Sequence, residues 1–294
     1  MRSRTIVSGG VLLGGLAGAA HAQSVGKMVE YDVRNAVVDM ASVWLTPFRG
    51  SGRDWLTTVG VVAGSAAISP FDDNVDRWVL AHRNESAWSV LKELREGGAA
   101  YSGKTITPVV AGLYVIGLAT KSTHVRDGVS GCAASYASGS IVRNYVFYEA
   151  IGRRRPDPLK GHQPVPIPAK QGEQYKFRGF PGADWGLHSL PAGHIANIAA
   201  CAGFLANRFE MGYAEPLVYL VTAGVGMGRI LDRRHWTSDT MLGAVFGYAV
   251  GKEVALRSLR RREGSKDDAA APASQGFFVA PEAGGVVAGW QWTF

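Results

Sequence analysis

The sequence predicts an all-α fold, a single helical bundle of about six core helices with a short β-strand or hairpin at its C-terminal end. Three observations lead to this prediction. Apolar stretches rich in Gly and Ala recur between charged residues, at 55–71, 105–120, 128–142, 195–207, 216–228 and 240–251. Each is shorter than the roughly 20 apolar residues of a lipid-spanning helix, or is interrupted, and so resembles a core helix. No repeat is visible, which argues against a solenoid or propeller, and with only two cysteines the fold must depend on a hydrophobic core.

The N-terminal residues are typical of a secretory signal peptide. Arg2 and Arg4 precede the apolar stretch "IVSGGVLLGGLAGAA", and "AHA" before Gln23 matches a small-residue cleavage site. We therefore expect residues 1–22 to be a signal peptide and the mature protein to be periplasmic, soluble or attached to the membrane at its surface. The alternative is a multi-pass membrane protein whose site faces the periplasm.

Cysteine content bears on the redox state of the chain, and net charge bears on the kind of partner that it suits. In an oxidising compartment, Cys132 and Cys201 either form one disulfide or remain two buried thiols. The formal charge of +7 falls to +5 when the two arginines of the signal peptide are removed. Such a mildly basic chain suits an anionic substrate or an anionic membrane surface. No cofactor and no nucleic-acid partner is indicated.

The helical domain is predicted to span residues 23–262. It begins with an extra helix whose expected role is packing, because apolar side chains recur at helical spacing at Val29, Val33, Val37, Met40 and Trp44. It ends in "LRSLRRREG", where the arginines suit a helix C-terminus and Gly264 suits a cap. Residues 263–294 are then a linker, "SKDDAAAPASQG", followed by the β appendage, in which aromatic residues alternate at Trp290, Trp292 and Phe294.

A long connection rich in Pro and Gly, residues 157–186, separates two helical stretches. Loops of this length in compact domains tend to be functional. The connection follows the first of three polar segments, which are "GRRRPDP" (152–158), "HSLPAGH" (188–194) and "GRILDRRHWTSD" (228–239). Taken singly, they have structural explanations: a solvated helix end, a histidine that happens to start a helix, and a surface pair at i and i+4.

Together, the three segments supply the groups that phosphoryl transfer through a histidine requires. A neutral His235 can attack phosphorus without a metal. Asp239, one helical turn later, can orient His235 and stabilise the imidazolium that forms. His194, at the start of a helix, can protonate the leaving alkoxide. These three residues are the predicted catalytic set.

The same segments contain groups that bind a phosphate. The guanidinium groups of Arg155 and Arg229 can hold its anionic oxygens in planar, bidentate fashion. Pro191 and Gly193 are expected to shape a helix N-terminus whose backbone N–H groups, including those of Ala192 and Gly193, face the phosphate. No metal site is predicted.

The three segments resemble the motifs of the type 2 phosphatidic acid phosphatase superfamily, which includes bacterial class A acid phosphatases and vanadium-dependent haloperoxidases. The family pattern is K-x6-R-P, then P-S-G-H, then S-R-x5-H-x3-D. The positions that match it are Arg155, Pro156, Pro191, Gly193, His194, Arg229, His235 and Asp239. The resemblance implies a helical bundle, a phosphohistidine on His235, and catalysis without a cofactor.

Three positions depart from the family pattern. Tyr148 stands where the first motif has Lys, Ala192 replaces the Ser of the second, and Gly228 replaces the Ser of the third. The family residues at these positions bind phosphate, and a lost hydrogen bond to a charged group costs roughly 1.5 to 3 kcal/mol. The resemblance therefore predicts weaker phosphate binding, with Arg153 and Arg154 as nearby candidates for the missing cation.

The favoured function is an exported, metal-independent phosphatase that hydrolyses a phosphate monoester or diphosphate, with a phosphorylated lipid as the favoured substrate. The alternatives are a non-specific periplasmic acid phosphatase, a vanadium haloperoxidase-like oxidoreductase, and a non-catalytic envelope protein with a degraded site. The missing Lys argues against tight vanadate holding, and the retained His, Asp and Arg residues argue against a degraded site. A zinc site built from His235 and Asp239 lacks a third ligand.

Overall fold

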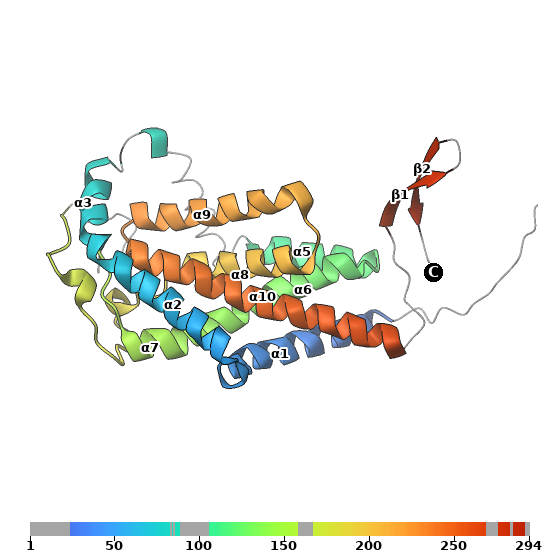
Figure 1. Ribbon diagram of the computed structural model, residues 1–294, viewed down its shortest axis with the longest axis horizontal. Helices are drawn as coiled ribbons and strands as arrows, with labels where there is room; N and C mark the ends of the chain where they lie inside the picture. The colour runs from blue at the N-terminus through green and yellow to red at the C-terminus, as the bar shows by residue number, and fades with distance from the viewer. Residues whose placement is uncertain are drawn as a thin grey trace, which may run out of the picture.

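The computed structural model describes residues 24–82, 84, 86–88, 106–157, 167–268, 276–282 and 285–291. The predicted signal peptide lies outside these residues. The described chain is mainly helical, as predicted, and its long helices form a bundle (Figure 1). The helices are α1 (Val25–Arg49), α2 (Gly52–Ile68), α3 (Asp72–His82), α5 (Ile106–Ala119), α6 (Thr123–Val142), α7 (Tyr148–Ile151), α8 (Gly193–Arg208), α9 (Glu215–Leu231) and α10 (Thr237–Asp268).

Helices α8 and α10 pack most closely, and glycines make this approach possible. A Cβ added at Gly247 would lie 2.0 Å from the carbonyl oxygen of Ala196, and one added at Gly251 would lie 1.9 Å from that of Ala200. No side chain fits at these two positions, so the two backbones are in direct contact. The packing fixes the start of α10 beside the start of α8, which is where the candidate site lies.

The hydrophobic core lies where α1, α6, α8 and α10 meet. Phe204 of α8 is 1% exposed and packs in one cluster with Val43, Ala134, Val250 and Val254. Fully burying a side chain of this size contributes roughly 1.5–3 kcal/mol. A disulfide joins α6 to α8 beside this cluster, between Cys132 and Cys201. The structure thus selects the disulfide over the two free thiols that the sequence left open.

Helix α1 packs through a different face from the one predicted. Val33 and Val37, which belong to its apolar stripe, are 57% and 58% exposed. Polar residues are buried instead, because Asp32 pairs with Arg126 at 2.8 Å and Asp39 pairs with Arg261. The expectation that the apolar stripe packs into the core is therefore wrong for Val33 and Val37, whereas Met40 of the same stripe packs against the core cluster.

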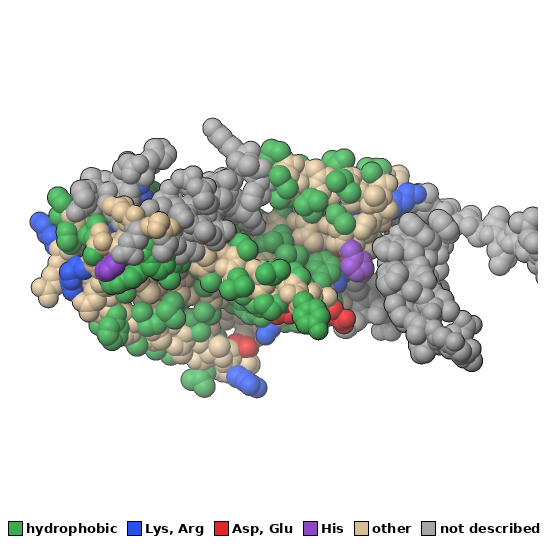
Figure 2. All heavy atoms as spheres, turned by 90° about the horizontal axis from the view of Figure 1, so that it is seen from above, with side chains coloured by type: hydrophobic (Ala, Val, Ile, Leu, Met, Phe, Trp, Pro, Cys, Tyr) green, Lys and Arg blue, Asp and Glu red, His purple; other side chains and the backbone are tan. Residues whose placement is uncertain are grey.

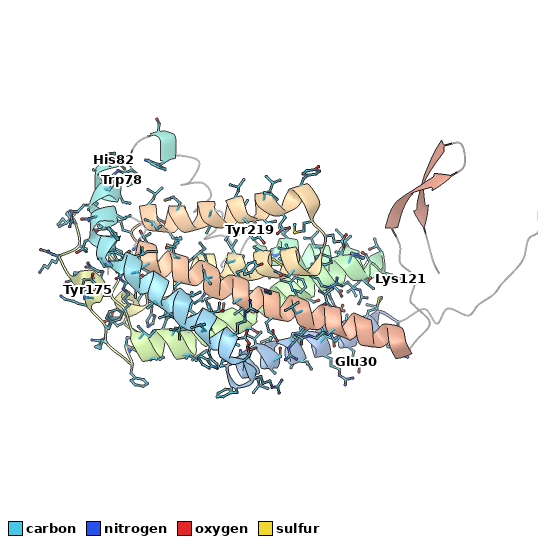
Figure 3. The ribbon with its side chains drawn as sticks, viewed as in Figure 1. Glu30, Trp78, His82, Lys121, Tyr175 and Tyr219 are labelled. Atoms are coloured by element: carbon cyan, nitrogen blue, oxygen red, sulfur yellow. A yellow bond between two sulfur atoms is a disulfide. The ribbon has the colours of Figure 1, made fainter. Side chains whose placement is uncertain are left out.

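The connection between α7 and α8 lies at one end of the bundle and is held there by α3. The Asp76 carboxylate accepts from the backbone N–H of Ala169 at 3.1 Å, and that of Asp73 accepts from Gly172 at 3.3 Å. Figure 3 shows Tyr175 of this connection at the same end as Trp78 of α3. The predicted functional loop thus covers the end at which α8 and α10 begin.

At the C-terminal end, α10 continues to Asp268, beyond the predicted end at residue 262. The backbone then follows two short antiparallel strands, β1 (Gly276–Glu282) and β2 (Gly285–Gln291), with Phe277 opposite Trp290. That these residues form a packed appendage stays a prediction. Among the helices of the described ranges, none combines the length and the apolar character needed to cross a membrane.

Candidate active site

The candidate site lies where α7 and α9 end and α8 and α10 begin, at the end of the bundle that carries α3 (Figure 1). Backbone hydrogen bonds join the three predicted segments there. The N–H of Arg155 donates to Gly186 at 2.8 Å, that of Ser189 to Arg153 at 3.1 Å, and that of Ala192 to Asp239 at 3.0 Å. Residues more than 80 positions apart are therefore brought together as one constellation.

His235 is held as a neutral imidazole. It is 2% exposed, and its Nδ1 lies 2.8 Å from the backbone carbonyl oxygen of Ser189. A carbonyl oxygen only accepts, so Nδ1 carries the proton and Nε2 keeps its lone pair. Burial, followed by the nearby charges of Arg155 and Arg229, lowers the pKa of His235 well below its usual value. The residue therefore has the charge state and tautomer of a nitrogen nucleophile.

Asp239 does not contact His235 directly, which corrects the predicted pairing. Its carboxylate accepts from Nη1 of Arg153 and the hydroxyl of Ser189, both at 2.5 Å, and from the backbone N–H of Trp236 at 3.1 Å. Ser189 links the two residues. Its hydroxyl donates to the Asp239 carboxylate, and its backbone carbonyl accepts from Nδ1 of His235. Asp239 thus positions His235 indirectly.

Arg153 is a structural centre of this network. It is 2% exposed, and its guanidinium pairs with Asp239 and with Asp72 of α3, the latter at 2.8 Å. Asp72 also accepts from the backbone N–H of Ser238 and so caps the first turn of α10. Arg154 pairs with Glu173 at 2.5 Å. Both arginines already have carboxylate partners, which disfavours the suggestion that either replaces the missing Lys.

Arg155 carries a buried charge whose hydrogen-bond partners among the described residues are all neutral. It donates to the backbone carbonyls of Trp185, His188 and Arg234 at 2.7–3.1 Å, and its guanidinium carbon lies 3.9 Å from the Trp185 ring centroid. Burial lowers its pKa to about 10, so it remains charged at neutral pH. Nη1 of Arg229 lies 3.5 Å from Oδ2 of Asp232. Arg229 acts on the same site, because its charge contributes to lowering the pKa of His194 and of His235.

His194 is the second residue of α8. Burial, followed by Arg229, Arg143 and Arg155, lowers its pKa to about 3, so it is neutral at physiological pH in the empty site. The Ala192 N–H was expected to face phosphate, but it donates to the carbonyl of Asp239, and Ala192 is fully buried. The first turn of α8 still offers the N–H groups of Gly193 and His194, which have no acceptor within the helix.

Tyr148 lies in the wall of the site without any charge of its own. Its hydroxyl donates to the carbonyl of Pro191 at 3.2 Å, and its ring stacks on His188 with centroids 4.9 Å apart. Burial raises its pKa, so the phenol stays protonated. Ser189 was missed by the sequence analysis because it acts through its backbone carbonyl, and Asp72 was missed because no motif marks it.

Comparisons with known proteins agree with this constellation. Residues 128–263, which contain all three segments, match the sequence profile of the PAP2 superfamily. These 136 of the 294 residues are similar to the PAP2 superfamily. The chain is also similar to the lipid A 1-phosphatase of Porphyromonas gingivalis, with 38% identity over 69 residues, 22% of this chain and 15% of that protein.

Two further proteins are similar to this chain. The probable diacylglycerol pyrophosphate phosphatase 1 of Schizosaccharomyces pombe is 33% identical over 119 residues, 34% of this chain and 43% of that protein. The chain thus spans less than half the length of either of these curated relatives. A transmembrane PAP2-type phosphatidylglycerolphosphate phosphatase from Bacillus subtilis superposes with a TM-score of 0.45 at 16% identity, over 70% of this chain and 94% of that one.

A metal centre does not fit the described part of the site. No three His, Cys, Asp or Glu side chains gather as ligands within the described ranges. His235 and Asp239, considered as zinc ligands from the sequence, are bound instead to Ser189, Arg153 and Trp236.

Proposed function

We propose that this protein belongs to the PAP2 superfamily and is an exported phosphatase that hydrolyses a phosphate monoester or diphosphate of a lipid through a phosphohistidine on His235. The observation that carries the proposal is the state of His235, a buried neutral imidazole whose Nδ1 is held by a carbonyl and whose Nε2 keeps its lone pair. Beside it, Arg155 presents a buried positive charge whose hydrogen bonds within the described part of the chain go to neutral groups. This is the combination that in-line attack on an anionic phosphorus needs.

The reaction proceeds in two steps. Nε2 of His235 attacks phosphorus, the bond between phosphorus and the leaving oxygen breaks, and His194 gives its proton to that oxygen. A water molecule then attacks the phosphohistidine while His194 takes its proton, and phosphate is released with His235 regenerated. Arg155 and Arg229 stabilise the charge on the phosphoryl oxygens in both steps.

His194 must be protonated to act as the acid in the first step. In the empty site burial, followed by the charges of three guanidinium groups, lowers its pKa to about 3. A phosphate dianion offsets these positive charges, so its arrival raises the pKa of His194 toward neutral pH. Substrate binding thus favours the protonated form of His194, which is the form that acts as the acid.

A lipid substrate is supported by the surface of the bundle and by the names of the relatives. Large apolar side chains are exposed along several helices, and Figure 2 shows hydrophobic side chains spread along one face of the molecule. Exposed apolar area of this kind marks contact with a membrane or another partner. The exposed apolar side chains on α2, α5 and α9 include Trp55, Leu56, Val59, Val62, Val109, Leu113, Val115, Ile116, Leu217, Leu220 and Val221.

Export to the periplasm is supported by the signal-like N-terminus and by the disulfide between Cys132 and Cys201. Disulfides persist in oxidising compartments and are rare in the cytosol. An anionic membrane surface would suit both the basic charge and the apolar side chains of the mature chain.

Phosphate release from a substrate panel tests the proposal. The panel contains phosphatidic acid, diacylglycerol diphosphate, lipid A 1-phosphate and a soluble aryl phosphate, with His235→Ala as the blank and His82→Ala, on the exposed end of α3, as the matched histidine control. We expect release from at least one dispersed lipid by the wild type and by His82→Ala only. Activity on the aryl phosphate alone would favour the acid phosphatase, and equal release by His235→Ala would refute the mechanism.

A further inference from the structure

We propose that Arg143 supplies the cationic phosphate contact that Lys supplies in the first motif of the family and that Tyr148 does not supply. The inference rests on the proposed function, because it concerns the phosphate subsite of the same reaction. Arg143 lies outside all three motif segments.

The backbone places Arg143 on the same side of the helix as Tyr148. Between α6 and α7 the chain forms a π-helical turn, Arg143–Phe147, and the backbone N–H of Tyr148 donates to the carbonyl of Arg143. A π turn brings residues five apart onto one face, and such turns are frequent at functional sites. The guanidinium carbon of Arg143 accordingly lies 5.7 Å from the centroid of the Tyr148 ring. A positive charge therefore lies beside the position from which the family's Lys would extend.

The charge of Arg143 has no carboxylate partner among the described residues. The residue is 8% exposed. Its Nη1 donates to the carbonyl of Gly193 at 3.0 Å and to Oδ1 of Asn197 at 2.8 Å, and its Nε donates to Oδ1 of Asn144 at 3.1 Å. All these acceptors are neutral, and Nη2 adds no hydrogen bond to a described residue.

Other buried arginines of the bundle are neutralised. Arg126 pairs with Asp32 at 2.8 Å, and Arg208 pairs with Asp127 at 2.7 Å. Burying a charge without a counterion is costly. Arg143 shares its unusual state with Arg155, the motif arginine assigned to phosphate. A bound anion would compensate both charges.

Arg143 also touches the turn that begins α8. A Cβ added at Gly193 would lie 3.0 Å from the guanidinium carbon and from Nη1 of Arg143, so the glycine leaves room for this side chain. His194 follows Gly193 directly, and Arg143 is among the three cations that lower its pKa. The charge of Arg143 therefore acts at the candidate acid of the reaction.

Orthovanadate, which mimics phosphate, serves as the probe, and its Kd for the full mature chain is measured by calorimetry alongside aryl phosphate turnover. Arg143→Gln should raise the Kd about tenfold or more, as expected when one charge-assisted bond is lost. The matched control is Asn197→Ala, which removes a hydrogen bond of Arg143 but keeps the charge, and it should change the Kd less than threefold. A change below threefold in Arg143→Gln, or an equal change in Asn197→Ala, overturns the inference.

Tyr148→Lys gives a second test that does not depend on the folding of Arg143→Gln. Since Arg143 already supplies the cation, adding Lys at position 148 should leave the Kd of the wild type within threefold or weaken binding. Tenfold tighter binding would show that the cationic position was vacant and would overturn the inference. If the wild type neither binds vanadate nor releases phosphate, the proposed function fails too; if it does both and Arg143→Gln matches it, only this inference fails.

Discussion

Replacing Ser189 with alanine should lower both stability and turnover, because Ser189 makes two different bonds. Its hydroxyl donates to Asp239 at 2.5 Å, and its carbonyl oxygen lies 2.8 Å from Nδ1 of His235. The substitution removes the first bond and leaves the second without its anchor. A hydrogen bond to a charged group contributes about 1.5–3 kcal/mol. Because Asp239 keeps Arg153 and the Trp236 N–H, we expect a loss of about 2 kcal/mol of unfolding free energy.

The effect on turnover comes from the position of the nucleophile. Loss of the anchor lets the carbonyl of Ser189 move and His235 move with it, and a misplacement on the order of 1 Å costs up to about a hundredfold in rate. We therefore expect kcat to fall by roughly tenfold to a hundredfold. The tautomer should not change, since the carbonyl remains as the acceptor.

The matched control is Ser238→Ala. The Ser238 hydroxyl also donates to a buried carboxylate at 2.5 Å, but that carboxylate belongs to Asp72, and Ser238 does not contact His235. Urea unfolding should show a comparable loss of stability in both variants, and turnover of an aryl phosphate should fall only in Ser189→Ala. Wild-type kcat in a folded Ser189→Ala, or an equal fall in Ser238→Ala, would refute this account of how Asp239 acts.

Three further predictions concern the whole chain. EDTA should leave phosphatase activity unchanged, and loss of activity that zinc or magnesium restores would overturn the metal-free mechanism. Burial keeps the folded pKa of His194, about 3, and of His235 below the unfolded value near 6.5, so the unfolded chain binds more protons between these values. Stability should therefore fall as pH is lowered below about 6.5, by up to about 1.4 kcal/mol per pH unit for each histidine. The urea midpoint, measured at several pH values, checks this expectation. The stability of His194→Ala must depend less steeply on pH than that of the wild type. Removing the disulfide with Cys132→Ser and Cys201→Ser should cost about 2–5 kcal/mol, and unchanged unfolding would show that it does not form.

The sequence predicted the site where chemistry depends on spacing along the chain. Spacing marked two pairs of residues that the fold does bring together. These are His235 with Asp239, within one helical turn, and Gly193 with His194, at a helix start. The helical bundle was predictable for a similar reason, because the apolar stretches between charged residues correspond to its helices. The stretches on α2, α5 and α9 were expected to lie in the core, but large apolar side chains on these helices are exposed.

What the sequence did not reveal depends on contacts between distant segments. Asp239 was expected to bind His235 because the two lie one turn apart, yet α10 begins only at Thr237 and the imidazole turns to the carbonyl of Ser189. The partner Asp72 lies in another helix and belongs to no motif. Arg143 was hidden for a different reason, since a π turn is invisible to a search based on α-helical spacing.

The most direct test of the account is to identify the phosphorylated atom of the trapped enzyme. His194→Ala is mixed with an aryl phosphate, quenched at alkaline pH to preserve phosphoramidates, and examined by mass spectrometry and ³¹P NMR. We predict one phosphoryl group, on Nε2 of His235, because Nδ1 is bonded to Ser189. A phosphoryl group on Nδ1, on another residue, or on no residue of a variant that still turns over the aryl phosphate would contradict the account.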